Sequence, residues 1–142
     1  MYAKILVPVD LSHGKVGERI LAVARHMAGP DGKIVLLSVL EAIPGFVASA
    51  IPAATIDANR NDAIAKLDAL ARSVGANVDV ALREGKPSAE ILAEAEHCGA
   101  DAIVLGSHRP NLSDYLLGST AARVVRHAQC SVIVDRALVA AD

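Results

Sequence analysis

The chain has 142 residues, of which 53% are hydrophobic but only 2% aromatic, and its formal net charge is −2. We expect a chain of this length to fold as one domain, residues 1–142, around an aliphatic core. Charges of both signs are interspersed, which argues against a nucleic-acid-binding protein, because such a protein carries a basic face.

The sequence shows no targeting or membrane-spanning segment. Its start, MYAKILVPVD, has one lysine and an apolar run too short for a signal peptide. The most apolar stretch, residues 39–56, is interrupted by Glu41, Pro44, Gly45 and Pro52, whereas a spanning helix needs roughly 20 apolar residues. We therefore expect a cytoplasmic protein without membrane insertion.

Five short runs rich in β-branched residues predict strands. They are residues 4–10, 33–40, 77–82, 101–107 and 131–135. Several of them are apolar on successive residues, as expected for strands that are buried on both faces of a parallel sheet.

Helical patterns separate these strands. The apolar stripes comprise Val16, Ile20, Val23, Ala24 and Met27; Ala63, Leu67, Leu70, Ala71 and Val74; Ile91, Leu92 and Ala95; and Ala121, Val124, Val125 and Ala128. Gly75 is suited to end the second helix and Pro87 to begin the third. Residues 41–55, interrupted by proline and glycine, are predicted as a long loop.

This alternation predicts an α/β fold, a single doubly wound five-stranded parallel sheet with helices on both faces. In such a sheet, ligands bind beyond the carboxyl ends of the strands, at the point where the strand order reverses. The first and fourth strands are the natural pair to flank that point. Their carboxyl ends carry Pro8, Val9 and Asp10 and the segment Gly106–Arg109.

The residue types at these ends suit a nucleotide. Gly106 lets a ligand approach the backbone closely, and Gly118-Ser119-Thr120 begins a helix, where free N–H groups favour a phosphate. The Asp10 carboxylate only accepts hydrogen bonds, which suits ribose hydroxyls or a metal. Each residue also has a simpler interpretation: Gly118 and Ser119 as a helix cap, Asp10 as a cap or turn residue. Their joint position favours the binding site.

Sharper enzyme motifs are missing from the sequence. It contains no G-x-x-x-x-G-K-[ST], no G-x-G-x-x-G after the first strand and no G-x-S-x-G. The cysteines (Cys98, Cys130) and the histidines outside the predicted site (His13, His26, His97, His127) show no metal-ligand spacing. We therefore assign no catalytic residue and no metal ligand, and we expect two free thiols.

Four segments together resemble the universal stress protein family, and the resemblance covers nearly the whole chain. They are KILVPVD (4–10), GKPSAEI (85–91), ADAIVLGSHR (100–109) and LLGSTAARVVRHAQCSVIV (116–134). The last two are most similar to the small bacterial F- and G-type members.

The resemblance implies a strand order of 3-2-1-4-5, a dimer, and ATP bound through the pattern Gly, two residues, Gly, nine residues, Gly-Ser or Gly-Thr. Carried over, the first glycine is Gly106 and the last pair is Gly118-Ser119, while Asp10 and Val39 line the adenosine. The sequence departs from the pattern: Arg109 replaces the middle glycine, and only eight residues, 110–117, follow it.

We therefore expect a regulatory stress-response protein that binds ATP or another adenine nucleotide, with or without Mg²⁺. The expected binding residues are Pro8, Val9, Asp10, Val39, Gly106, Ser107, His108, Arg109, Gly118, Ser119 and Thr120. One alternative is a nucleotide-independent stress protein that docks partner proteins, and another is a slow ATPase, for which no motif supplies a base. We expect a homodimer through residues 131–135, because the last strand has unpaired backbone groups at the sheet edge.

Overall fold

The computed structural model describes residues 1–11, 14–42, 44–106 and 118–136, without the side chains of residues 14–17 and 48. The elements are β1 (Lys4–Pro8), α1 (Gly14–Ala28), β2 (Lys33–Leu40), α2 (Gly45–Ala48), α3 (Ala53–Val74), β3 (Val78–Glu84), α4 (Pro87–Cys98), β4 (Ala102–Gly106), α5 (Ser119–His127) and β5 (Ser131–Asp135). The predicted strands agree with these bounds to within two residues.

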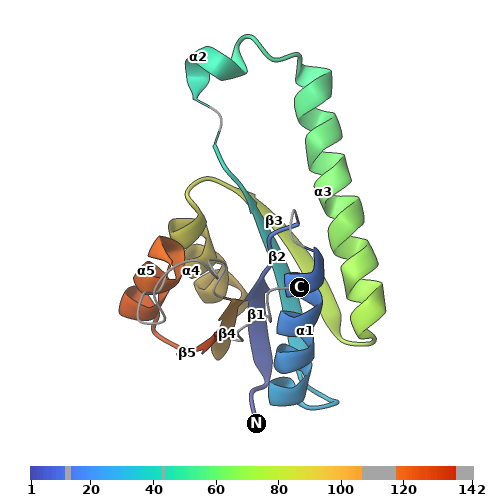
Figure 1. Cartoon of the computed structure of the whole chain (residues 1–142), viewed down its shortest axis with the longest axis vertical. Coiled ribbons are helices and arrows are strands. Elements are labelled where there is room, and N and C mark those ends of the chain that lie inside the picture. Colours follow the sequence, from blue (N-terminus) through green and yellow to red (C-terminus); the bar gives the residue numbers. More distant parts are fainter. Residues whose placement is uncertain (12–13, 43, 107–117, 137–142) are drawn as a thin grey trace.

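The five strands form one parallel sheet in the order β3-β2-β1-β4-β5 (Figure 1). Helices α1 and α3 pack on one face of the sheet, and α4 and α5 pack on the other. The predicted fold class and strand order are therefore confirmed. The order reverses between β1 and β4, so the chain continues from these two neighbouring strands to helices on opposite faces of the sheet, α1 and α5.

Each central strand contributes to a core on both of its faces. Ile5 and Val7 of β1 lie in the cluster under α1 and α3, whereas Leu6 between them lies in the cluster under α4 and α5. Ile34 and Val35 of β2 divide in the same way. Because successive side chains of a strand point to opposite faces, an uninterrupted apolar run is what a strand covered on both faces requires.

Two helix boundaries follow directly from glycine and proline. Gly75 ends α3 with a φ of 112°, a region of backbone space that glycine occupies without steric cost. Pro87 is the first residue of α4, where its missing N–H would have had no helical partner. Both predicted roles are confirmed.

The prediction of a long loop over residues 41–55 is wrong. The segment contains the short helix α2, and α3 begins at Ala53, well before the expected stripe that starts at Ala63. Pro44 and Pro52 are the N-cap residues of these two helices, with φ values of −54° and −57°. The first turns of α3 are exposed, so they carry no apolar stripe by which a helix could be recognised.

The predicted stripe of the last helix is wrong at one position. Ala121 and Val124 of α5 are buried against the sheet, but Val125 is 46% exposed. Successive helical residues lie 100° apart, so the side chain that follows a central core residue points to the helix flank. Arg123 and Arg126 are exposed.

Candidate functional site

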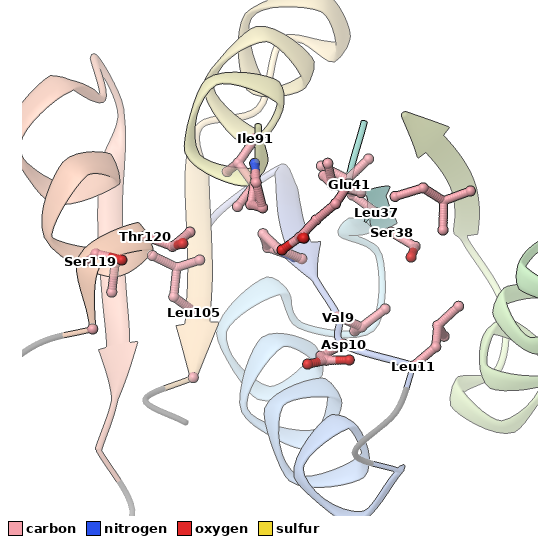
Figure 2. Close-up of a pocket in the computed structure, with 17 residues that line it drawn as sticks. Val9, Asp10, Leu11, Leu37, Ser38, Glu41, Ile91, Leu105, Ser119 and Thr120 are labelled. Atoms are coloured by element: carbon pink, nitrogen blue, oxygen red, sulfur yellow. The ribbon is translucent and has the colours of Figure 1, made fainter. Parts of the chain in front are cut away.

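A cleft of about 550 Å³ opens at the carboxyl ends of β1, β2 and β4 (Figure 2). Its apolar lining includes Val9, Leu37, Ile91 and Leu105, which are all buried. The volume lies within the usual range for small-molecule sites, and the position is where a doubly wound sheet binds ligands.

Eight of the eleven predicted binding residues line this one cleft. They are Pro8, Val9, Asp10, Val39, Gly106, Gly118, Ser119 and Thr120. They come from four places in the chain: the ends of β1, β2 and β4, and the start of α5. The other three predicted residues, Ser107, His108 and Arg109, lie outside the described residues.

The start of α5 presents backbone donors to the cleft. Gly118 is the N-cap residue, and no side-chain hydrogen bond caps the helix there. Ser119 and Thr120 follow in the first turn, and their side chains lie at the cleft in Figure 2. The first N–H groups of a helix have no helical partner and carry a partial positive charge, so they favour an anion at this end of the cleft.

A second helix, α4, also begins at the cleft, and the sequence analysis missed it. Pro87 in its first turn and Ile91 in its second both line the cleft. The strand-end rule could have found it, because α4 follows β3 and therefore begins at the same edge of the sheet as the predicted residues.

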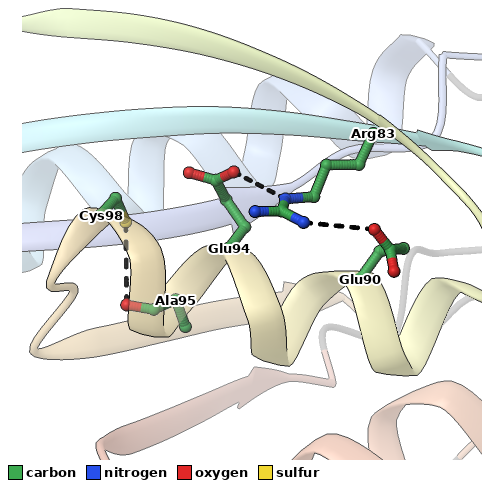
Figure 3. Close-up of polar contacts among 5 residues, drawn as sticks. All are labelled: Arg83, Glu90, Glu94, Ala95 and Cys98. Atoms are coloured by element: carbon green, nitrogen blue, oxygen red, sulfur yellow. Dashed lines mark hydrogen bonds and ion pairs between the residues drawn. The ribbon is translucent and has the colours of Figure 1, made fainter.

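An ion-pair network holds α4 against β3. Arg83 of β3 donates to Glu94 over 2.8 Å and to Glu90 over 3.3 Å (Figure 3). The hydrogen bond to Glu94 is the main reason that the pKa of Arg83 is raised, and burial opposes it. Glu94 is only 7% exposed, so the pairing satisfies a carboxylate that would otherwise be buried without a counter-charge.

The described lining of the cleft contains two charged side chains, and both are acidic. Asp10 follows β1 and Glu41 follows β2. The sequence analysis did not identify Glu41 as a site residue, although it lies two positions after the predicted Val39. The positive contributions within the described lining come from the starts of α4 and α5.

Neither cysteine contributes to the cleft. Cys98 and Cys130 are both free thiols, as predicted, and burial raises the pKa of each. In the described ranges, no three His, Cys, Asp or Glu side chains gather as a metal-binding group. None of the helices in those ranges has the length and apolar character needed to span a bilayer.

Comparison with known proteins identifies the family. A family model described as "Universal stress protein family" matches residues 1–136. The chain belongs to the universal stress protein family. Universal stress protein G of Shigella flexneri is 32% identical over 145 residues, which cover 96% of this chain and all of that protein (100%). The solved structure of the hypothetical protein MJ0577 aligns with a TM-score of 0.77 at 28% identity, covering 94% of this chain and 95% of that one.

Two more distant universal stress proteins were solved with nucleotides. The protein from Archaeoglobus fulgidus in complex with dAMP is 23% identical, with a TM-score of 0.63 and coverage of 95% of this chain and 98% of that one. A universal stress protein in complex with cAMP is 20% identical, with a TM-score of 0.61 and coverage of 95% and 97%. At these identities the likeness shows a shared fold.

Proposed function

We propose that this protein is a regulatory module that binds an adenine nucleotide in the cleft at the carboxyl ends of β1, β2 and β4. The observation that carries the proposal is the meeting of eight sequence-predicted residues in one cleft. The dAMP and cAMP complexes of two distant relatives support the ligand class.

The two ends of the cleft suit the two ends of a nucleotide. In the proposed arrangement, the phosphates lie at Gly106, Gly118 and Ser119, where the start of α5 offers backbone donors. The adenine lies against Val9 and Val39, and the Asp10 carboxylate accepts hydrogen bonds from ribose hydroxyls. With ATP, a Mg²⁺ ion would be held mainly by the phosphates themselves.

A substitution at Gly118 tests the proposed phosphate end without harming the fold. A Cβ at Gly118 would meet no atom within 4 Å, and its φ of −59° suits any residue. Aspartate is a favoured N-cap residue, so Gly118→Asp should fold normally while its carboxylate repels the phosphates. In a calorimetric titration we expect AMP and ATP to bind at least about tenfold more weakly, and adenosine to change far less.

The matched control is Gly45→Asp at the first residue of α2. A Cβ there also meets nothing within 4 Å, and Gly45 does not line the cleft. This variant should bind every nucleotide as the wild type does. Failure of adenosine, AMP, cAMP and ATP to bind the wild type at millimolar concentration would refute the proposal. It would favour the alternative of a stress protein that docks partners without a nucleotide.

Arg109 carries a separate prediction, made from the sequence because the residue lies outside the described ranges. It stands where the family pattern has a glycine, and a guanidinium–phosphate contact contributes about 1.5–3 kcal/mol. Arg109→Ala should therefore weaken ATP by roughly ten- to a hundredfold, with a much smaller effect on adenosine. Equal ATP affinity for the wild type and Arg109→Ala would show that the arginine is not a ligand contact.

We also propose a symmetric homodimer through β5. The strand forms one edge of the sheet, so one row of its backbone donors and acceptors has no partner strand within the chain. Val132→Lys should weaken this dimer. Because Val132 also packs against the core under α4 and α5, a melting curve has to accompany the mass measurement to show that the variant is folded. A monomer mass in light scattering at tens of micromolar wild-type protein would refute the dimer.

A further inference from the structure

Glu41 is a charged side chain of the cleft without an assigned role. It directly follows the last residue of β2 and lines the cleft. Figure 2 shows its carboxylate directed from the end of β2 towards the side of the cleft where α4 and α5 lie. Within the described ranges, no hydrogen bond or ion pair engages this carboxylate.

The Glu41 carboxylate affects the binding of charged ligands, because the charged side chains of the described lining are all acidic. Asp10 and Glu41 contribute two negative charges, and no Lys, Arg or His belongs to the described lining. Each helix start contributes about half a positive charge, so those of α4 and α5 together contribute about one unit of positive charge. A ligand phosphate that lies near the Glu41 carboxylate is therefore repelled by it.

We propose that Glu41 selects ligands by their charge: its carboxylate disfavours metal-free triphosphates relative to nucleoside monophosphates, linear or cyclic. The inference rests on the proposed nucleotide site. A carboxylate accepts hydrogen bonds and repels phosphate, and each added phosphate increases the repulsion. Mg²⁺ cancels part of the triphosphate's charge, so it narrows the difference between ATP and AMP.

The size of the effect follows from Coulomb's law. Two unit charges about 10 Å apart in a water-like medium change an equilibrium constant about twofold at low salt. The linear phosphates of ATP carry about four negative charges, those of AMP about two, and adenosine none. Replacing Glu41 with a neutral residue of the same shape should therefore strengthen the binding of ATP about 16-fold and that of AMP about fourfold, and leave that of adenosine unchanged.

The experiment compares three proteins with three ligands. Adenosine, AMP and ATP are titrated, without Mg²⁺ and at about 20 mM salt, into wild type, Glu41→Gln and Glu96→Gln. Glu96 is the matched control, because it is exposed on α4 and does not line the cleft. We expect a gain in affinity that increases from adenosine to AMP to ATP, and only in Glu41→Gln. This gain should shrink at 0.3 M salt or with Mg²⁺, since both screen the charge.

Three other outcomes overturn the inference. Equal changes for adenosine and ATP would mean that Glu41 acts by shape or hydrogen bonding rather than by charge. Unchanged affinities for all three ligands would mean that its charge is not felt in the cleft. If none of the three ligands binds any of the proteins, the proposed nucleotide site itself fails. If nucleotides bind wild type and Glu41→Gln equally well, only the role of Glu41 is overturned.

Discussion

The cleft and the segment that follows β2 are two regions of very different packing. The lining of the cleft is anchored in the core, with Leu37 fully buried and Leu105 only 5% exposed. Between Ser38 and Ala63, by contrast, no residue that the structure describes is buried. Figure 1 shows α2 and the first half of α3 projecting beyond the carboxyl edge of the sheet. We refer to residues 44–62 as the arm.

The first part of the arm, residues 44–56, is apolar in composition and yet exposed. Residues 42–56 contain no charged side chain, and Phe46, the one phenylalanine of the chain, is 81% exposed. Helix α3 connects the arm to the sheet, because its first half belongs to the arm and its second half packs on the sheet through Ala63 and Leu67. The stability of the fold should therefore depend on one half of this helix and be nearly indifferent to the other.

The largest expected effect tests this division within α3. Leu67 is fully buried in the core under α1 and α3, so Leu67→Ala should cost about 2–5 kcal/mol of unfolding free energy. Ile56, in the first half of the helix, belongs to neither core cluster, and Ile56→Ala should cost less than about 1 kcal/mol. Urea denaturation followed by circular dichroism measures both. Similar losses for the two variants would contradict the division.

The next effect concerns the packing of α4 beside the cleft. Arg83→Met leaves Glu94, which is 7% exposed, without its partner and should cost about 1–3 kcal/mol. Because Glu94 is the group left unpaired, adding Glu94→Leu to Arg83→Met should recover part of the loss. A double variant that is less stable than Arg83→Met would mean that the network contributes by shape, and not by satisfying a buried charge.

A smaller, pH-dependent effect lies at the amino edge of the sheet, opposite the cleft. The backbone N–H groups of Ala3 and Lys4 each donate to the Asp101 carboxylate over 2.9 Å. Burial raises the pKa of Asp101, but these hydrogen bonds outweigh it, so the pKa lies below its ordinary value of 3.8. Asp101→Asn should cost roughly 1 kcal/mol at pH 7.

The pH dependence of this cost has a definite sign. The folded-state pKa of Asp101 is depressed, so its contribution is fully present above pH 3.8 and is lost as the pH falls through the folded-state value. The stability difference between wild type and Asp101→Asn, from denaturation curves at pH 3 to 7, should therefore narrow below about pH 4. A difference that stays constant across this range would contradict the assignment.

The contrast between the buried sheet and the exposed arm explains which parts of the fold could be predicted from the sequence. The five strands were recognisable because apolar residues run without interruption where both faces are covered, as at Ile34 and Val35. Residues 41–55 were predicted as a loop, because an exposed helix carries no stripe and Pro44 and Pro52 suggested breaks. In fact each proline precedes a helix as its N-cap residue.

The candidate site shows a similar limit. Asp10, Gly106 and Gly118 were predicted from strand ends and a helix start, and all three line the cleft. Pro87 and Glu41 were missed. Pro87 was recognised only as a helix start, and Glu41 was recognised only as a charge that interrupts an apolar stretch. The strand-end rule could have identified Pro87, because α4 follows β3. The direction of the Glu41 side chain depends on the packing around the end of β2, and residue spacing does not contain that information.

The smallest expected effect lies at the tip of the arm. Because Phe46 is 81% exposed, Phe46→Ser removes little buried surface and should change the unfolding free energy by less than about 0.5 kcal/mol. The chain has no tryptophan, so Phe46→Trp supplies a single reporter, whose emission should match fully solvated indole. A blue-shifted emission together with a loss above about 1 kcal/mol in Phe46→Ser would mean that the arm packs on the body of the protein. If the emission shifts only as the protein concentration rises, the arm is instead a contact between molecules, as an exposed apolar patch would favour.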